Sequence, residues 1–436
     1  MKHRRQAITN WAHSLSFQPD RNVYPKTLSE IQALPQRTHE RKSNLRVGGS
    51  RHSFTPLIES QGMWVDLKKW SGLEVGDDPS AYWLRSGTSL ARANKLLHRR
   101  GRALSSLGDI DVQTVAGALS TGTHGTGIQF GSLSDQIEKL EWVNGQGELV
   151  SCSRTKNPEL MQAASLSLGT FGILTRLQFQ TQPSFFLKLT KSYSELDALI
   201  ENWKKLLEHY RHFEFFWFPY TNDAVVKTTK DVPLPQRPTR RLRTKLENVF
   251  LENISFQAIS TLARWAPGAT KRICQWEGAL SRGTSTTQAW SHHIFPTVRW
   301  VRFMEMEYAI PLTHTEAVLK AIRQQLNSKT YHVHFPIEVR FGKPETSFLS
   351  PAYQRPTLFV AVHMYQGMPY ENYFRDLEQV FLAHEGRPHW GKWHSLTAPQ
   401  LAQKYPQWNT FEAFRRAQDP DNIFLTPYLK NLLHPE

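Results

Sequence analysis

Glycine, serine, threonine and histidine residues are concentrated in two short segments near the beginning of the chain. The first is Val47–Phe54 (VGGSRHSF) and the second is Val115–Gly127 (VAGALSTGTHGTG). Small and hydroxyl residues after a strand expose backbone N–H groups and let the main chain approach a pyrophosphate closely. Neither segment matches the dinucleotide-binding or P-loop patterns, which need a downstream acidic residue or a Gly-Lys-Ser/Thr sequence. The two segments together predict a phosphate-rich cofactor that is bound in another way.

Ionisable residues with a suggestive spacing lie in the C-terminal half. Pro336–Phe341 reads as a strand, and the alternation of its side chains puts Glu338 and Arg340 on one face. His363 lies in a second strand-like run, and Lys392 ends the sequence His-Trp-Gly-Lys. A carboxylate beside a guanidinium is most often a structural ion pair, but such groups also act as bases and electrostatic stabilisers. The residues alone leave both interpretations open.

Three further histidines are candidate metal ligands, and the sequence favours packing roles for all of them. No carboxylate or cysteine cluster accompanies His124 in its loop. His332 and His334 point to one face of a predicted strand but lack a third ligand. We therefore predict no metal site, and the missing dinucleotide fingerprint predicts no nicotinamide cofactor.

Short strands and two helices are predicted to hold the two glycine-rich segments in place. Leucine and alanine residues share one face of a helix over Ser89–Arg99, which Gly101 ends. A second helix is predicted from Asn157, with Pro158 at its first position, to near Leu168. The predicted strands are Leu45–Val47, Met63–Leu67, Tyr82–Arg85 and Ile173–Phe179.

The composition restricts the class of protein. The 436 residues include 53 Lys and Arg against 38 Asp and Glu, a formal charge of +15, which either favours anionic ligands or only keeps the surface soluble. Two cysteines exclude a disulfide framework and a cysteine-rich metal site. The basic N-terminus is followed by no apolar stretch, so no secretory signal is expected. The sequence predicts a soluble, cytoplasmic protein.

An arginine-rich segment precedes an amphipathic pattern in the middle of the chain. Val232–Lys245 is predicted to be an exposed loop, and Leu246–Leu262 repeats apolar residues every four positions, which predicts a helix that ends near Pro267. Such a helix most often packs on its own domain. The alternative is a peripheral, salt-sensitive membrane contact through basic side chains. These side chains are Arg237, Arg240, Arg241, Arg243 and Lys245.

The glycine-rich segments and several spaced motifs resemble the vanillyl-alcohol-oxidase-type FAD-binding domain. More narrowly, they resemble the branch that contains aldonolactone oxidases and alditol oxidases. The resemblance extends over nearly the whole chain and is weakest over residues 184–330. The motifs are Thr9–Trp11, Val47–Phe54, Gly108–Gly117, Ser120–Gly127, Leu168–Thr175, Gly386–Lys392 and Asp419–Tyr428.

The resemblance implies an α+β, two-domain flavoprotein with an FAD-binding domain of the PCMH type. The expected domains are an FAD-binding domain over 1–183, a substrate (cap) domain with an antiparallel sheet over 184–409, and a segment over 410–436 that returns to the first domain. It also implies that His52 is bonded covalently to the 8α-methyl group of FAD. Arg51 replaces a glycine that is common before this histidine.

The resemblance further implies the residues of the site. Glu338, Arg340, His363 and Lys392 are expected beside the flavin, where Arg340 and Lys392 would stabilise the negative charge of the reduced ring. His363 or Glu338 would accept the substrate proton. The expected cofactor-binding residues are Gly48, Gly49, Ser50, Arg51, His52, Ser53, Gly117, Ser120, Thr121, Gly122, Thr123, Gly125, Thr126, Gly172 and Ile173.

The expected reaction is oxidation of an alcohol group of a D-arabinono- or L-gulono-1,4-lactone, with dioxygen as acceptor and hydrogen peroxide as product. An alditol oxidase is the alternative. However, Asp109 stands where alditol-oxidising relatives often have a serine, which weakens that assignment. A non-catalytic basic protein that binds anionic ligands is a third possibility. No nucleic-acid-binding module is recognisable, so no nucleic-acid partner is expected.

Overall fold

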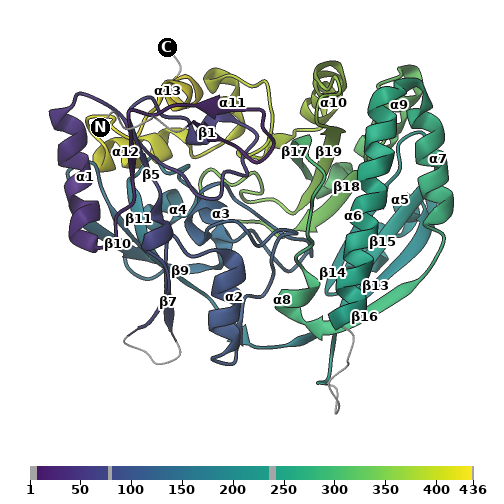
Figure 1. The fold of residues 1–436 in the computed structure, drawn as a ribbon, viewed down its shortest axis with the longest axis horizontal. Coiled ribbons are helices and arrows are strands. Elements are labelled where there is room, and N and C mark those ends of the chain that lie inside the picture. The colour runs from purple at the N-terminus through teal and green to yellow at the C-terminus, as the bar shows by residue number, and fades with distance from the viewer. Residues whose placement is uncertain (1–6, 77–80, 235–241, 435–436) are drawn as a thin grey trace.

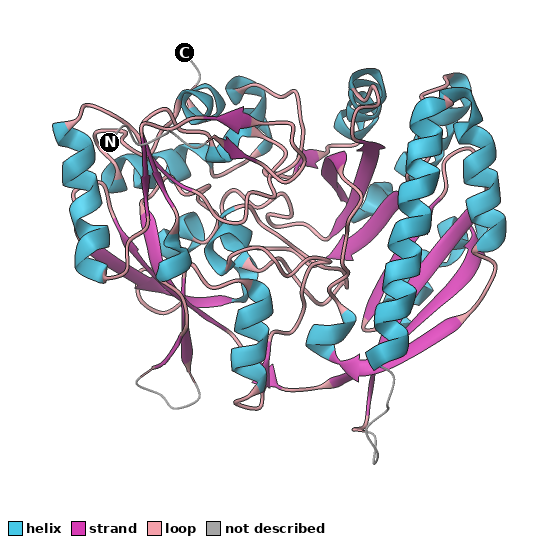
Figure 2. Ribbon diagram, viewed as in Figure 1, coloured by secondary structure: helices cyan, strands magenta, loops and turns pink. Residues whose placement is uncertain are grey.

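The computed structural model describes residues 7–76, 81–234 and 242–434, without the side chains of residues 242–252. Figure 1 shows two parts. One part contains the first strands and helices together with the C-terminal helices, and the other contains a large sheet. Loops fill the centre of the molecule between the two parts (Figure 2).

The first part contains a parallel three-stranded sheet and an antiparallel five-stranded sheet. The three-stranded sheet has the order β3-β5-β4, with bounds Arg21–Val23, Met63–Val65 and Leu45–Val47. The five-stranded sheet has the order β10-β9-β11-β7-β6, with bounds Leu149–Ser153, Ile137–Val143, Ile173–Phe179, Tyr82–Arg85 and Leu73–Val75. Two small pairs are β1 (Ile8–Thr9) with β2 (Ser16–Phe17) and β8 (Arg102–Ala103) with β12 (Gln182–Pro183).

Helices from both ends of the chain cover these sheets. The C-terminal residues Leu401, Phe411 and Leu429 pack in the same apolar core as Leu140 and Leu177 of the five-stranded sheet. The C-terminal helices therefore belong structurally to the first part. The helices are α1 (Leu28–Glu40), α2 (Leu90–His98), α3 (Val115–Ser120), α4 (Pro158–Ala164), α11 (Ala398–Lys404), α12 (Trp408–Gln418) and α13 (Pro427–Leu433).

Most predicted elements of this part are confirmed. The Ser89 side chain caps α2 by accepting a hydrogen bond from the Arg92 N–H, and Gly101 has the positive φ of 69° that suits a helix end. The prediction for α4 was wrong in two details. Asn157 has a φ of 59° and makes no side-chain cap, and the helix ends at Ala164. The Leu168 backbone itself has a positive φ of 55°, which a helix does not allow.

The second part is built on an eight-stranded antiparallel sheet, as predicted for the substrate domain. Its order is β16-β13-β15-β14-β18-β19-β17-β20. The bounds are Ser285–Trp290, Phe186–Glu195, Asp223–Val232, His212–Trp217, Ile337–Gly342, Thr357–Tyr365, Phe303–Pro311 and Arg387–Pro388. Successive side chains of a strand point to opposite faces. Phe213, Met306 and Val339 therefore point to one face and join an apolar core with Trp203 and Phe374 of the neighbouring helices.

Helices α5 (Leu196–His209), α9 (Thr315–Ser328) and α10 (Glu371–Ala383) cover that apolar face. Helices α6 (Leu242–Trp265) and α7 (Thr270–Leu280) lie over the opposite face, where Gln257 donates a hydrogen bond to the Tyr365 hydroxyl and Gly278 packs on Asp223. Helix α8 (Ser291–Ile294) follows β16, and its His292 lies against His98 of α2. The exact domain boundaries at 183 and 409 stay a prediction, because Tyr353, Trp390 and Leu396 from inside the predicted substrate domain pack in the core of the first part.

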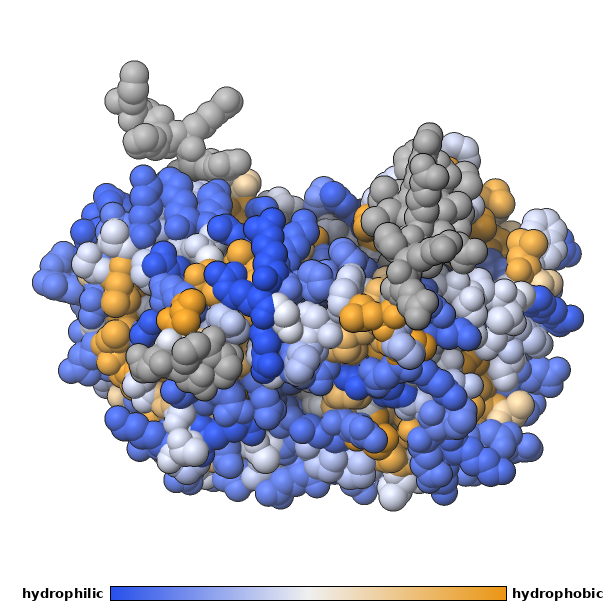
Figure 3. All heavy atoms as spheres, turned by 90° about the horizontal axis from the view of Figure 1, so that it is seen from below, coloured by the Kyte–Doolittle hydropathy of each residue, from blue (hydrophilic) through white to orange (hydrophobic). Residues whose placement is uncertain are grey.

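The amphipathic helix predicted over Leu246–Leu262 lies within α6, which ends at Trp265 as expected. Arg237, Arg240 and Arg241 lie outside the described residues, as do the side chains of Arg243 and Lys245. Among the described helices, none is long and apolar enough to span a bilayer. The face of the molecule seen in Figure 3 is mostly hydrophilic, with smaller groups of hydrophobic residues between the hydrophilic ones.

Candidate active site

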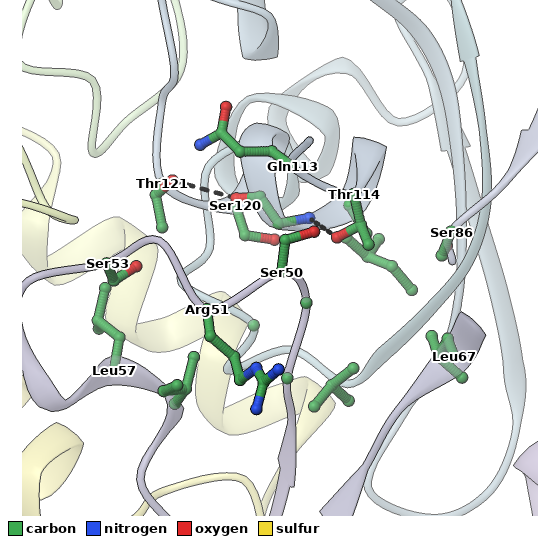
Figure 4. A pocket seen from close by; sticks show the side chains of 18 of the residues that line it. Ser50, Arg51, Ser53, Leu57, Leu67, Ser86, Gln113, Thr114, Ser120 and Thr121 are labelled. Carbon is green, nitrogen blue, oxygen red and sulfur yellow. Dashed lines mark hydrogen bonds between the residues drawn. The ribbon is translucent and has the colours of Figure 1, made fainter. Parts of the chain in front are cut away.

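A pocket lies between the loop after β4 and helix α3. Both glycine-rich segments contribute to its lining, together with the turn before β11 (Figure 4). The loops pack so closely that side chains are excluded at several positions. A Cβ atom on Gly48 would lie 2.2 Å from the Trp64 ring, and one on Gly172 would lie 2.1 Å from the Val143 carbonyl oxygen. Glycine is required here because the backbone itself forms the wall.

The lining of this pocket suits an anionic ligand. It contains Arg46 and Arg51, and no aspartate or glutamate is among its described lining residues. Arg46 is buried and donates hydrogen bonds to three carbonyl oxygens, those of Leu57, Leu168 and Gly169, at 2.5–3.1 Å. Burial lowers the pKa of Arg46 to about 10, so it remains a cation at neutral pH. Because no carboxylate of the described residues pairs with it, its charge is available to a bound phosphate.

Two buried polar atoms that face this pocket have no hydrogen-bond partner in the described structure. They are Ser86 Oγ and Gln113 Oε1. Buried polar atoms are normally paired, so these atoms are free for a ligand. Glycine backbone, uncompensated arginine and unpaired polar atoms together fit the dinucleotide cofactor expected from the sequence.

The structure brings ten of the fifteen predicted cofactor-binding residues to this pocket. They are Gly48, Gly49, Ser50, Arg51, His52, Ser53, Gly117, Ser120, Thr121 and Gly172. The other five do not line it. Gly122, Thr123 and Gly125 pack against their own part of the fold, Thr126 Oγ1 donates to the Phe213 carbonyl oxygen at 2.5 Å, and Ile173 is fully buried in a core.

His52 lies at the end of the pocket nearest the large sheet. The indole of Trp11 stacks on its ring with centroids 5.3 Å apart. Burial and the nearby charge of Lys392 lower the pKa of His52 to about 4, so the imidazole is neutral. Arg51, before it, has a φ of 62°. This left-handed conformation explains why related loops often have glycine there.

The face of the large sheet opposite its apolar core carries ionisable residues, and we call this face the charged wall. Glu214 on β14, Glu305 and Glu307 on β17, and Glu338 and Arg340 on β18 all alternate with apolar residues. All five side chains are buried. The predicted shared face of Glu338 and Arg340 is confirmed, because these residues form an ion pair.

Arg340 lies at the centre of a balanced network in the charged wall. Its guanidinium also contacts Asp109 at 2.7 Å and Glu214 at 2.9 Å. Arg299 reaches Asp109 at 2.6 Å, and Lys227 reaches Glu214 at 3.1 Å. The described network thus contains three carboxylates and three cations.

These charges shift the pKa values of the carboxyl groups in different directions. Burial would raise the pKa of Asp109, but Arg340, Lys227 and Arg299 outweigh burial and hold it well below its usual range. Glu338 differs, because burial and the neighbouring carboxylates raise its pKa despite Arg340. Asp109 is therefore a fixed anion, whereas Glu338 binds a proton more readily.

Lys392 and His363 meet at a second carboxylate of the charged wall. Lys392 forms an ion pair with Glu305, and His363 Nε2 lies 3.4 Å from the same carboxylate. The pKa of Glu305 lies well below its usual value, because the charge of Lys392 overcomes the effect of burial. Lys392 also lies 5.3 Å from the centre of the Phe54 ring, two residues after His52. This group therefore adjoins the His52 end of the pocket.

The prediction that no carboxylate accompanies His124 was wrong. Its Nε2 lies 2.5 Å from Glu307 Oε1, and its Nδ1 lies 2.9 Å from the Gly125 carbonyl oxygen. His389 is close enough to complete a possible ligand set of three residues. However, His389 Nδ1 accepts a hydrogen bond from the Gly391 N–H, which leaves the proton on Nε2 of a neutral ring. The group is therefore better described as a hydrogen-bonded cluster.

The predicted strand around His332 and His334 was also wrong, since residues 330–335 form a loop. His334 is buried, with Nε2 2.9 Å from Ser260 Oγ, and His332 is exposed and has a φ of 54°. A strand does not allow such a φ. The packing role predicted for both residues fits these positions.

Sequence reasoning missed several members of the site. Two charges at positions i and i+2 inside an apolar strand signal a buried polar face, and Phe303–Tyr308 (FMEMEY) has this pattern. The pocket residues Arg46 and Gln113 carried no comparable signal. The missed residues are Arg46, Gln113, Glu214, Lys227, Arg299, Glu305 and Glu307.

Comparisons with known proteins agree with this description. Residues 19–153 match the FAD binding domain family, and residues 177–432 match the D-arabinono-1,4-lactone oxidase family. The whole fold is similar to cholesterol oxidase from Brevibacterium sterolicum, with a TM-score of 0.80 at 16% identity over 98% of this chain and 96% of that chain. The fold and the pocket define a two-domain FAD-dependent oxidoreductase of the PCMH type.

Two relatives narrow the class. L-Gulono-1,4-lactone dehydrogenase from Mycobacterium tuberculosis is 34% identical over 98% of this chain and 99% of its own length. L-Gulonolactone oxidase from Scyliorhinus torazame is 28% identical over 97% of each chain. The chain belongs to the D-arabinono-1,4-lactone oxidase family, which includes oxidases and dehydrogenases of aldonolactones.

Proposed function

We propose that this protein oxidises a ring hydroxyl of an aldono-1,4-lactone of the D-arabinono or L-gulono type. The observation that carries the proposal is the charged wall beside the His52 end of the anion-binding pocket. The names of the relatives supply the substrate class. Bound FAD supplies the hydride acceptor, its N5 atom. The pocket backbone, Arg46 and Arg51 hold its pyrophosphate.

The residues of the charged wall have separate roles in the proposed reaction. Lys392 and Arg340 are fixed cations that would stabilise the negative charge of the reduced flavin ring. His363 is buried, and neither ring nitrogen has a hydrogen-bond partner among the described residues. It accepts the hydroxyl proton, and Glu305 stabilises the resulting imidazolium. Glu338 is tied to Arg340 and orients the substrate hydroxyl groups.

The experiment is anaerobic mixing of the purified yellow protein with a panel of aldonolactones and alditols, followed by absorbance. We expect fast bleaching by an L-gulono- or D-arabinono-1,4-lactone. Bleaching by alditols alone contradicts the substrate class, and a colourless protein that FAD does not stabilise contradicts the whole proposal. A His363→Gln variant should bleach more slowly and with an altered pH profile, because its amide cannot take up the proton.

Two finer points belong to the same proposal. Dioxygen reoxidises the flavin and yields hydrogen peroxide, and His52 holds the flavin covalently. Peroxide release in air tests the reoxidation by dioxygen, and reduced flavin that persists in air while a dye acceptor is turned over contradicts it.

In-gel flavin fluorescence after denaturation tests the covalent attachment through His52. It should be present in the wild type and absent in His52→Ala.

A further inference from the structure

The turn between β1 and β2 holds both sides of His52, and we call residues 10–15 the N-terminal clasp. The Trp11 N–H donates to the Arg51 carbonyl oxygen at 2.8 Å. The Asn10 side-chain amide donates to the Ser53 carbonyl oxygen at 3.0 Å. The clasp thus fixes the backbone one residue before and one residue after His52.

The clasp also fixes the ring of His52. The Trp11 indole lies over the imidazole at an interplanar angle of 24° and meets Phe54 and Phe303 edge-on, at 6.4 and 5.2 Å. Its own shape is set by Asn10, whose side-chain oxygen accepts hydrogen bonds from the Ser14 and Leu15 N–H groups at 3.0 and 3.1 Å. The buried Asn10 therefore fixes the turn that places Trp11 over His52.

Stacking is the type of contact that a nucleophilic histidine needs. A hydrogen bond to a ring nitrogen would orient the imidazole but would occupy its lone pair. The described structure contains no hydrogen bond to either ring nitrogen of His52, while Trp11 holds the plane of the ring. The low dielectric of this site keeps the ring neutral, so one nitrogen retains a free lone pair.

We propose that Asn10 and Trp11 are positioning residues for the covalent attachment of FAD to His52, an inference that rests on the covalent attachment proposed above. In that step an imidazole N–H bond and a C–H bond of the 8α-methyl group break and one C–N bond forms. Two protons are released to solvent, and two electrons pass to dioxygen. The clasp accelerates the step by holding the nitrogen in the direction of attack.

The test measures how fast flavin becomes resistant to acid precipitation. Cells that express each variant receive a pulse of labelled riboflavin, and acid-stable and acid-released label are counted over time. We expect Trp11→Ala to slow attachment by about 10- to 100-fold, because a reacting atom that is misplaced by about 1 Å slows a reaction by up to about this factor. Total bound FAD should stay at the wild-type level, and Trp11→Phe should recover much of the rate.

Trp290 provides the matched control, because it also packs on a histidine, His98, at 4.7 Å, outside the pocket lining. Trp290→Ala should lower the melting temperature without changing the rate of attachment. Equal rates in wild type and Trp11→Ala overturn the role of the clasp but leave the covalent bond intact. A wild type without acid-stable flavin overturns both the clasp and the covalent attachment, and it leaves the proposed oxidation untouched.

Discussion

The two walls that meet near His52 are built from different groups. The pocket wall combines glycine backbone, hydroxyl groups and two arginines with apolar side chains, without a described carboxylate. The charged wall consists of buried carboxylates, each held against a cation or a histidine. The pocket wall keeps its positive charge uncompensated, whereas the charged wall neutralises nearly all of its charge internally.

This difference separates binding from catalysis. An uncompensated cation attracts an anion, so the pocket wall is suited to hold a pyrophosphate. Paired charges that cannot reorient are suited to stabilise charge that develops during a reaction, because no reorganisation is needed at that moment. A change in the pocket wall should therefore alter cofactor binding, and a change in the charged wall should alter rate and stability together.

Arg340→Ala should have the largest effect on stability. It leaves Asp109, Glu214 and Glu338 with one cation fewer in a buried site, which typically costs about 3–5 kcal/mol of unfolding free energy. Denaturant unfolding measures it. The double variant Arg340→Ala/Glu214→Gln removes one negative charge as well and should recover part of the loss. A loss below about 1 kcal/mol, typical of exposed pairs, would show that the network is not a buried one.

Lowering the pH should destabilise the protein before the carboxylates titrate. Burial lowers the pKa of His212 to about 3, and of His334 and His394 to about 4. An unfolded histidine binds its proton near pH 6.5, so stability is lost as the pH falls from about 6.5 towards 4, by up to about 1.4 kcal/mol per unit and residue. Thermal melts at pH 7, 6 and 5 measure this loss, and His334→Gln should reduce its slope. A constant melting temperature would contradict the buried neutral state.

Arg51→Gly should stabilise the pocket wall slightly. Glycine adopts the φ of 62° without strain, and we expect a gain of about 1 kcal/mol over a residue with a Cβ atom. Arg51→Ala is the matched control, since both variants lose the guanidinium and only glycine relieves the backbone. The difference between their melting temperatures is the measurement. An alanine variant as stable as the glycine variant would show that the loop is not strained.

Membrane association should be the smallest effect, and it concerns neither wall. Trp265 at the end of α6 is 83% exposed, and Trp276 and Leu280 on α7 are 70% and 84% exposed. With the arginine-rich segment before α6, these residues favour a peripheral contact with anionic lipid that weakens as salt rises. Sedimentation with anionic vesicles at low and high salt measures it. Equal recovery in the supernatant at both salt concentrations would exclude the contact.

The pocket wall was largely predictable from the sequence because its residues are contiguous. Val47–Phe54 forms one loop, and its glycine and hydroxyl pattern directly describes what the backbone does there. The exceptions are residues such as Arg46 and Gln113, whose orientation depends on how distant segments pack. Ile173 stays a prediction, since its side chain is buried in a core and does not line the pocket.

The charged wall was only half predictable because strands far apart in the sequence assemble it. Glu338 and Arg340 share one strand, so alternation alone placed them together. Glu214 and Glu307 join them only through the strand order of the sheet, which no local pattern defines. The pairing of His124 with Glu307 spans 183 positions. The alternation of residues also gave a wrong prediction, because His332 and His334 fit the pattern of a strand but lie in a loop.

The central claim, that the charged wall serves chemistry, is tested most directly by anaerobic stopped-flow reduction of the flavin in Lys392→Met. The Lys392 side chain is 21% exposed and pairs with one carboxylate, so its loss disturbs folding less than that of Arg340. With saturating lactone and full FAD content, reduction should slow by about 10²–10³-fold. Lys392→Arg, which keeps the charge, should retain most of the rate. A wild-type reduction rate in Lys392→Met would contradict the claim, whatever its melting temperature.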